Sequence, residues 1–266
     1  MFTGKTALIT GASSGLGREL SLEFARLKVN LALFDRDEVM LKKTGQDCRD
    51  AGAETLEVAG DVTSAEDCRD FINDAEERFG TIDYLVACAG ISMWAKFEDV
   101  QDVSMFRTMM DINYLGVVHC SYFALPHLKK SGGMIVVISS IQGKVGVPFH
   151  TGYVASKFAL QGFFESLRIE LEGQGVDILM VLPHWLRGTN LRSNAFGKNG
   201  QALGSKRKKH TGESITVEKC RDEIIKAMKK RKRELIIPPK LGLLPWLNLI
   251  SPGLVRSIIK KKTNQP

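Results

Sequence analysis

The stretch Thr10-Gly11-Ala12-Ser13-Ser14-Gly15-Leu16-Gly17 decides the fold, because it joins an apolar run, 6–9, to a helix-like segment, 18–27. A strand that turns through glycines into a helix leaves the first helical N–H groups unpaired, where the helix dipole favours an anion. Glycines also allow a tight turn and close approach of the backbone to a phosphate. The stretch therefore predicts a dinucleotide site that includes Gly11, Ser13, Ser14, Gly15, Leu16 and Gly17. Glycine clusters also mark ordinary turns, and this alternative stays open here.

Short apolar runs alternate with longer helical patterns along the chain. The predicted strands are 6–10, 30–34, 55–59, 84–87, 134–138, 178–182 and 234–237. The predicted helices are 15–27, 37–51, 65–78, 103–129, 152–171 and 217–230. This alternation predicts an α/β fold of the Rossmann type, with a doubly wound parallel sheet between two layers of helices. No linker or repeat interrupts residues 1–185, so we expect the 266 residues to form one domain with a C-terminal extension over 238–266.

Positive charge is concentrated in the last quarter of the chain. Residues 201–266 hold 17 of the 37 Lys and Arg but only 5 of the 30 Asp and Glu. Two basic clusters, 206–209 and 229–233, precede an apolar segment, 241–255, that Pro245 and Pro252 interrupt. This segment is shorter than the roughly 20 residues of a membrane span. The favoured interpretation is a solvated face beside a hydrophobic flap; contact with an anionic membrane surface is the next alternative, and no nucleic-acid partner is expected.

The cysteines and the start of the chain provide evidence about the cellular compartment of the protein. Five cysteines, an odd number, show no CxxC spacing, so neither a disulfide framework nor a metal site is predicted. The first strand begins almost at once, which leaves no room for a leader peptide. We therefore expect a cytoplasmic protein that could be peripheral to a membrane through its tail.

Two carboxylates follow predicted strands at the edge where parallel sheets bind ligands. Asp35 lies eighteen residues after Gly17, where a carboxylate accepts hydrogen bonds from an adenosine ribose and repels a 2′-phosphate. This favours NAD over NADP, although Arg36 could pair with that phosphate. Asp61 follows the third strand. Either carboxylate can also be a simple turn or cap residue.

Tyr153 and Lys157 are four residues apart in a predicted helix and so share one face. A nearby ammonium favours the phenolate, so the pair could exchange protons with a substrate. Ser140 ends an apolar strand thirteen residues before Tyr153, and Asn113 stands inside a long helix, where an amide often has a polar task. Taken alone, the Tyr–Lys spacing is equally that of a surface contact.

The combination of these motifs is more specific than any one of them. The order TGASSGLG, Asp61, Cys88-Ala89-Gly90, Asn113, Ser140, Tyr153-x-x-x-Lys157 and Pro183 resembles the short-chain dehydrogenase/reductases over residues 5–190. The resemblance implies an NAD(P)-dependent oxidoreductase that interconverts a secondary alcohol and a ketone.

Residue roles are also implied by the resemblance. The glycine loop, with Ala89 and Gly90, would hold the cofactor, and Asp61 with Val62 would meet the adenine. Tyr153 would exchange the proton, while Lys157 would bind the nicotinamide ribose and lower the phenol pKa. Ser140 would hydrogen-bond the substrate oxygen, and Asn113 would support a water leading to Lys157.

The chain departs from the family pattern at two places. Cys88 stands where the family usually has Asn, and loss of that amide is expected to soften the pocket floor. The usual Pro-Gly is replaced by Pro183-His184-Trp185-Leu186, with Thr189 one residue late. We still assign Pro183, Leu186 and Thr189 to the cofactor, and His184 either to the substrate side or to packing.

The remaining expectations concern substrate and assembly. Segment 190–212 reads as a substrate lid, and an apolar pocket for a hydrophobic alcohol or ketone is predicted from four aromatic residues, Trp94, Phe149, Trp185 and Phe196. The family resemblance implies a homodimer or homotetramer joined through 103–129 and 152–171. Two alternative functions stay open, a cofactor-binding sensor or scaffold without turnover and a membrane-surface protein that acts through its basic tail.

Overall fold

The computed structural model describes residues 2–204 and 214–263. Within them, a sheet of seven parallel strands has the order β3-β2-β1-β4-β5-β6-β9. The strands are β1 (Thr6–Thr10), β2 (Asn30–Asp35), β3 (Thr55–Ala59), β4 (Tyr84–Ala87), β5 (Met134–Ile138), β6 (Asp177–Pro183) and β9 (Glu234–Ile237). The predicted doubly wound α/β fold is confirmed. The basic cluster 206–209 and the end of the predicted lid fall outside the described residues.

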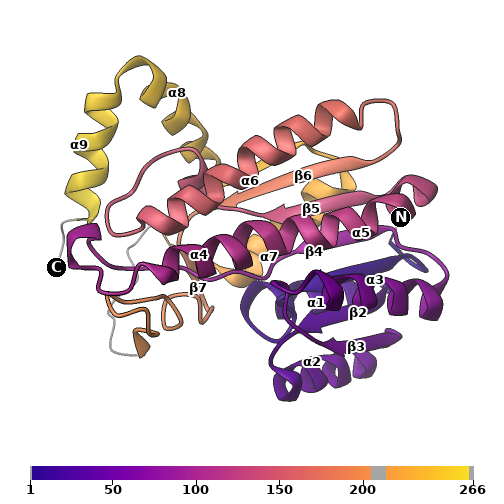
Figure 1. The fold of residues 1–266 in the computed structure, drawn as a ribbon. Helices are drawn as coiled ribbons and strands as arrows, with labels where there is room; N and C mark the ends of the chain where they lie inside the picture. The colour runs from indigo at the N-terminus through magenta and orange to yellow at the C-terminus, as the bar shows by residue number, and fades with distance from the viewer. Residues whose placement is uncertain (1, 205–213, 264–266) are drawn as a thin grey trace.

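Helices cover both faces of the sheet (Figure 1). One core cluster joins the sheet to α1 (Gly15–Arg26), α2 (Glu38–Asp50) and α7 (Val217–Lys229). The other joins it to α3 (Ala65–Phe79), α5 (Gly116–Ser131) and α6 (Thr151–Glu170). These are the two helical layers that the alternating pattern predicted.

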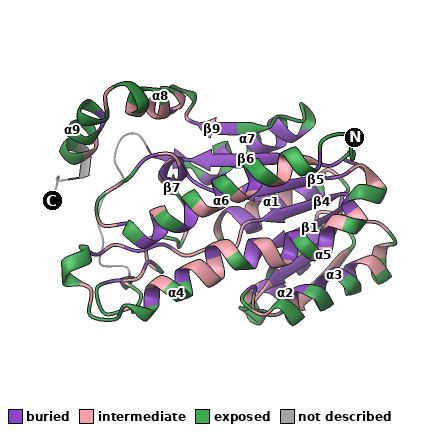
Figure 2. Cartoon of the chain, turned by 45° about the horizontal axis from the view of Figure 1, so that its top comes forward, coloured by how far each residue is buried: buried purple, intermediate pink, exposed green. Residues whose placement is uncertain are grey.

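The central strands are continuous apolar runs because they are buried on both faces. All five residues of β1 and all four of β4 are buried (Figure 2). Phe24 is fully buried in the first cluster, and Phe34 stacks on Phe71 in the second at 4.6 Å between ring centroids. Burial of one such ring stabilises the fold by about 1.5–3 kcal/mol. This core holds the carboxyl ends of the strands in fixed positions.

The predicted helix 103–129 is present, but it contains a wider turn. The chain forms α4 (Ser104–Met110), a π-helical turn (Asp111–Leu115) and then α5. The wide turn contains Asn113, whose side chain hydrogen-bonds the backbone of Ile91 on the neighbouring loop. Such π turns are frequent at functional sites.

The chain leaves the sheet after β9 and forms a separate projection. A short 3-10 turn (Pro239–Gly242) leads into α8 (Leu243–Ile250) and α9 (Pro252–Thr263). Figure 1 shows these two helices, in yellow, standing away from the layered body. Across the described part of the chain, every helix is too short or too polar to cross a lipid bilayer.

The helices assigned to self-association carry exposed apolar side chains. Tyr122 on α5, and Phe158 and Ile169 on α6, are all exposed. This is compatible with a homodimer or homotetramer, and the assembly of copies stays a prediction.

Candidate active site

A cavity of about 710 Å³ opens at the carboxyl edge of the sheet, beside β1 and β4, where the strand order reverses. Ligands of open parallel sheets bind at this point. All predicted cofactor residues and three of the four predicted catalytic residues line the cavity. They are Gly11, Ser13, Ser14, Gly15, Leu16, Gly17, Asp35, Arg36, Asp61, Val62, Ala89, Gly90, Ser140, Tyr153, Lys157, Pro183, Leu186 and Thr189. Their roles in binding and catalysis stay predictions.

The glycine loop between β1 and α1 forms one wall, and it has no room for side chains at two positions. Gly11 has φ +69°, and a Cβ there would lie 2.8 Å from the backbone nitrogen of Ala89. A Cβ on Gly17 would lie 2.1 Å from the carbonyl oxygen of Gly11. The bare backbone of this loop is therefore required by close packing, as the dinucleotide hypothesis assumed.

The N-terminus of α1 differs from those of the other helices that follow strands. Side chains of Asp37, Ser64 and Thr216 accept hydrogen bonds from the first turns of α2, α3 and α7. Ser14 makes no such bond to α1, whose first turn also lacks an acidic residue. The α1 N–H groups thus face the cavity without a side-chain acceptor, which fits a pyrophosphate.

The carboxylates after β2 and β3 lie on the same side of the cavity. Asp35 accepts hydrogen bonds from the backbone N–H groups of Ser13 and Asp37, each at 3.1 Å. The hydrogen bond from Ser13 joins the end of β2 to the glycine loop. The hydrogen bond from Asp37 stabilises the turn after β2, which is the alternative role that the sequence analysis gave to Asp35. Asp61 likewise accepts the N–H of Thr63 at 2.9 Å. Both carboxylates therefore shape turns while still lining the cavity.

The floor after β4 is braced by a side chain that sequence reasoning missed. The N–H groups of Cys88 and Ala89 both donate to the hydroxyl oxygen of Thr10 at 3.1 Å. Burial raises the pKa of the Cys88 thiol to about 12, so it stays protonated at neutral pH. Thr10 thus braces the backbone at the position where the resemblance implies an Asn in place of Cys88, and the softening of the floor stays a prediction.

Tyr153, Lys157 and Ser140 come together on the opposite wall. Tyr153 and Lys157 are both buried on α6, and the Lys157 Nζ lies 5.6 Å from the centroid of the Tyr153 ring. The same Nζ donates to the carbonyl oxygen of Ile138 at 3.0 Å. Ser140 follows β5, where its hydroxyl donates to the carbonyl oxygen of Pro183 at 3.4 Å, and its proximity to Tyr153 acts to lower the pKa of that phenol. The alternative of a surface contact for this pair is thereby excluded.

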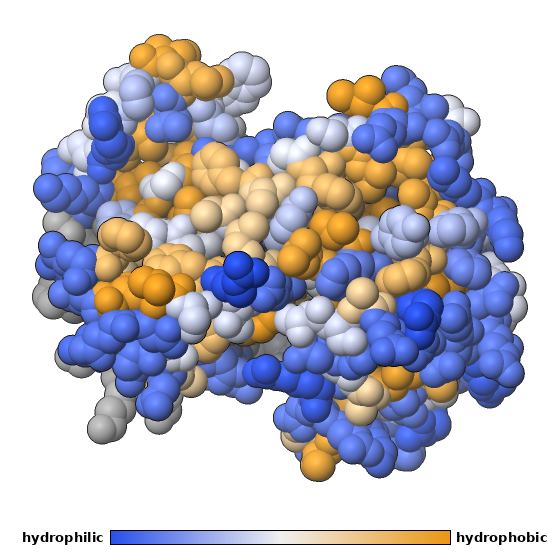
Figure 3. Space-filling view, in the orientation of Figure 1, coloured by the Kyte–Doolittle hydropathy of each residue, from blue (hydrophilic) through white to orange (hydrophobic). Residues whose placement is uncertain are grey.

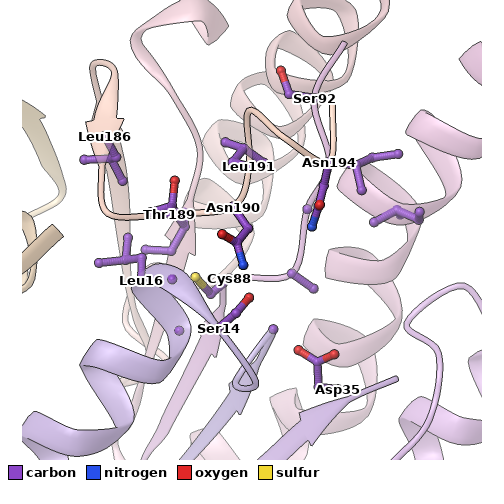
Figure 4. A pocket seen from close by; sticks show the side chains of 18 of the residues that line it. Ser14, Leu16, Asp35, Cys88, Ser92, Leu186, Thr189, Asn190, Leu191 and Asn194 are labelled. Carbon is purple, nitrogen blue, oxygen red and sulfur yellow. The ribbon is translucent and has the colours of Figure 1, made fainter. Parts of the chain in front are cut away.

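The loop after β6 closes one side of the cavity. The His184 N–H donates to the carbonyl oxygen of Ile237 at 2.8 Å, and Leu186 lies in β7 (Leu186–Arg187), which pairs with β8 (Ile215–Thr216). A Cβ on Gly15 would lie 3.3 Å from the Thr189 Cβ, so Thr189 covers the glycine loop. Figure 4 shows Leu186, Thr189 and Asn190 on a loop that passes over Ser14 and Leu16. The altered spacing of this loop therefore still brings Leu186 and Thr189 to the cavity.

A sequence model of the short chain dehydrogenase family matches residues 5–199. The chain belongs to the short-chain dehydrogenase/reductase family. Its members are NAD(P)-dependent oxidoreductases, so this short-chain dehydrogenase is an enzyme of that class.

Relatives with curated names agree with this membership. The "11-beta-hydroxysteroid dehydrogenase-like 4A" of Arabidopsis thaliana is 34% identical over 265 residues, which cover 98% of this chain and 85% of that protein. The "11-beta-hydroxysteroid dehydrogenase" of Pinus massoniana is 38% identical over 201 residues, 75% of this chain but only 56% of the relative. The chain therefore spans just over half the length of that second relative.

Solved structures share the fold over almost the whole chain. A short-chain dehydrogenase/reductase from Burkholderia phymatum in complex with NAD has a TM-score of 0.82 at 25% identity and covers 95% of each chain. An alcohol dehydrogenase from Thermococcus sibiricus, complexed with 5-hydroxy-NADP, has a TM-score of 0.74 at 26% identity and covers 88% of this chain and 95% of its own. Neighbours of this short-chain dehydrogenase thus bind either type of nicotinamide cofactor.

Burial dominates the ionisation of the two central groups in this short-chain dehydrogenase. It raises the pKa of Tyr153 to about 12, and the hydrogen bond with Ser140 opposes part of the rise. It lowers the pKa of Lys157 to about 8. In the protein alone, the low dielectric around these groups therefore disfavours both the Tyr153 phenolate and the Lys157 ammonium. The family resemblance implies a lowered pKa for the Tyr153 phenol, and this would require a further positive charge in the cavity.

Asn113 does not line the cavity of this short-chain dehydrogenase. Its side-chain oxygen accepts the Ile91 N–H at 2.8 Å, while its amide nitrogen donates to the Ile91 carbonyl oxygen and to the Ser156 hydroxyl. A Cβ on Gly90 would lie 3.2 Å from the Asn113 Oδ1 and 3.9 Å from the Lys157 Nζ. Asn113 therefore lies just behind Lys157 as a buried brace, and the water-holding role stays a prediction.

Of the four aromatic residues predicted to line the substrate pocket, two line the cavity and two do not. Trp185 and Phe196 line the cavity, whereas Trp94 and Phe149 stack on each other, with ring centroids 5.5 Å apart, and do not. Trp94 instead supports Trp185, with centroids 6.0 Å apart. Asn190, Arg192 and Asn194 of the predicted lid also line the cavity, as does Ser92, which sequence reasoning missed. The Arg192 guanidinium lies 4.6 Å from the Trp185 ring centroid, a loop contact that carries no periodic signal in the sequence.

Proposed function

We propose that this chain interconverts a secondary alcohol and a ketone by hydride transfer, with Tyr153 as the acid–base group and NAD as the preferred cofactor. One observation carries the proposal: Tyr153, Ser140 and Lys157 are buried together on the wall that faces the glycine loop. A nucleotide on that loop would place its reactive end between the loop and these side chains.

Each side chain has a distinct task in the proposed reaction. During reduction the Tyr153 hydroxyl donates its proton to the carbonyl oxygen as negative charge develops there, and during oxidation the phenolate accepts the alcohol proton. Ser140 donates a hydrogen bond to the same oxygen. Lys157 supplies a positive charge that favours the phenolate and binds the ribose hydroxyls.

A bound nicotinamide would supply the hydride and, when oxidised, a positive charge. The bare glycine loop and the uncapped start of α1 fit its pyrophosphate. That added charge acts against the burial that holds the Tyr153 pKa near 12, and so favours proton release where oxidation needs it.

Preference for NAD is supported by Asp35, whose carboxylate lies beside Ser13 at the end of the cavity away from Tyr153. A 2′-phosphate there would meet this negative charge. Arg36, next to it on the cavity wall, acts in the opposite direction. Fluorescence titration with NADH and NADPH measures the balance; tighter NADPH binding would refute the use of Asp35.

The substrate proposed is a hydrophobic alcohol or ketone. Trp185, Phe196 and Leu191 line the part of the cavity outside the glycine loop, and relatives carry the name 11-beta-hydroxysteroid dehydrogenase. A polycyclic or long-chain carbonyl compound matches these walls.

The decisive experiment replaces Tyr153 with Phe. We expect kcat for ketone reduction with NADH to fall by about 10²–10⁴-fold, since the proton donor is lost, while NADH affinity stays within about twofold. Tyr122→Phe, the same change at an exposed tyrosine of α5, is the matched control and should keep full activity. Full activity of Tyr153→Phe would refute the acid–base role.

The same assay separates an enzyme from the sensor alternative. A sensor binds NADH without turnover of any compound in a panel of apolar alcohols and ketones. Turnover by the wild-type protein that depends on Tyr153 therefore excludes that alternative.

A further inference from the structure

The C-terminal arm, residues 238–263, exposes a concentration of large apolar side chains. Trp246 is 67% exposed, Leu249 77% and Ile250 82%, and α8 has no buried residue at all. Figure 3 shows hydrophobic residues at the tip of the projection formed by α8 and α9. Isolated exposed apolar residues are ordinary, but a helix made almost wholly of them marks an interaction surface.

These side chains follow helical periodicity and so form a continuous face. Leu243, Trp246, Leu247 and Ile250, at spacings of three and four residues, are all exposed on one side of α8. Leu254 and Ile258 repeat the spacing on α9, whose neighbouring residue Val255 is buried. The exposed apolar side chains of the arm therefore lie on both of its helices, which contact each other.

The charged residues of the arm itself have a single sign. Residues 238–266 contain five basic residues and no acidic one. Arg256 and Lys260 lie four apart on α9, and Lys261 continues the stripe of Leu254 and Ile258. An apolar helix face beside basic side chains complements a surface with anionic headgroups above an acyl layer.

We propose that the C-terminal arm docks this protein on an anionic lipid bilayer, with the apolar face of α8 at the acyl boundary and the basic residues of α9 at the lipid phosphates. The helices lie in the interface and do not cross it, since α8 has 8 residues and α9 has 12. Pairing with the arm of a second copy is disfavoured, because a two-fold contact would bring two exclusively basic segments together.

The arm and the cavity lie at the same edge of the sheet, so a lipid surface bound by the arm would be on the cavity's side of the protein. β9 runs parallel to the other strands, so the arm starts at the same carboxyl edge of the sheet that carries the cavity. The docking proposal does not depend on the reaction, and it can be tested without any substrate.

The test is flotation of the full chain with vesicles of phosphatidylcholine, alone or with about 30% phosphatidylserine. We expect strong flotation with the anionic vesicles, weaker flotation without phosphatidylserine, and partial release in about 0.5 M salt. The double variant Leu249→Glu with Ile250→Glu should lose at least about tenfold in binding. Neither side chain is buried, so the variant should fold.

The matched control is Val39→Glu with Phe97→Glu. These residues are 78% and 67% exposed on α2 and on the short turn Phe97–Asp99, so the control adds the same charge to exposed apolar positions outside the arm and outside the helices assigned to self-association. It should float like the wild-type protein. Equal flotation of the arm variant, or flotation of neither protein, would overturn the proposal. A change from dimer to monomer in the arm variant, seen by light scattering without vesicle binding, would identify a second copy as the occupant.

Discussion

The two sides of the cavity are built differently. The cofactor side is built around a glycine loop, where the close contacts of Gly11 with Ala89 and of Gly17 with Gly11 leave no space for additional atoms. The substrate side consists of side chains on loops, among them Trp185, Arg192 and Phe196. The first arrangement accepts one shape of ligand, and the second can be altered one side chain at a time. The structure thus separates a closely packed wall of backbone from a wall of side chains, to which the proposed substrate contacts belong.

The rigidity of the cofactor side is tested by Gly17→Ala. The added Cβ would lie 2.1 Å from the Gly11 carbonyl oxygen, so the loop must shift. A strain of about 1–3 kcal/mol predicts NADH binding weakened by about 10–100-fold, measured by fluorescence titration. Gly146→Ala is the control, since a Cβ there meets no atom within 4 Å. Equal NADH affinity in the two variants would contradict a rigid cofactor side.

Lys157 lies where the two sides meet, and its burial gives a pH-dependent effect. Its pKa is about 8 in the folded protein against 10.5 for an ordinary lysine, so between these values the unfolded chain holds more protons. The free energy of unfolding then rises with pH in this window, and the contribution is least favourable below pH 8. From pH 8 to about 9.5, the wild-type protein should gain about 1–2 kcal/mol relative to Lys157→Met.

Urea unfolding at several pH values, without added cofactor, measures this difference. Tyr153 and the buried cysteines titrate in both proteins, so their contributions largely cancel in the comparison. Parallel pH curves for wild type and Lys157→Met would show that the Lys157 ammonium is not disfavoured by burial.

Sequence patterns were sufficient for the cofactor side because its constraints are local. A buried strand, a glycine turn and a helix start follow one another within residues 6–26, and the two carboxylates stand at the end of β2 and two residues beyond β3. The parallel sheet then brings every strand end to one edge. The geometry of this half follows from the order of elements alone.

The substrate side could not be predicted to the same degree because its contacts join distant segments. Trp94 and Phe149 have the composition of pocket residues, yet they stack on each other behind Trp185. The π turn at Asn113 depends on hydrogen bonds to Ile91, which precedes it by 22 residues. Neither arrangement has a periodic signature. The apolar run 241–255 was recognised, but whether its helices pack or project depends on the tertiary structure.

The adaptability of the substrate side is tested by Trp185→Leu. Loss of the ring removes an apolar wall and the support for the Arg192 guanidinium, 4.6 Å from the ring centroid. Aromatic contacts of this kind contribute about 0.5–1.5 kcal/mol, so KM for a bulky apolar ketone should rise by about 3–10-fold. NADH affinity should stay nearly constant, because the glycine loop is untouched. Trp246→Leu makes the same change on the exposed arm and should leave KM unaltered in assays without lipid. If Trp185→Leu instead weakens NADH and ketone binding equally, the two sides of the cavity are not independent, and the cofactor contributes to the substrate wall directly.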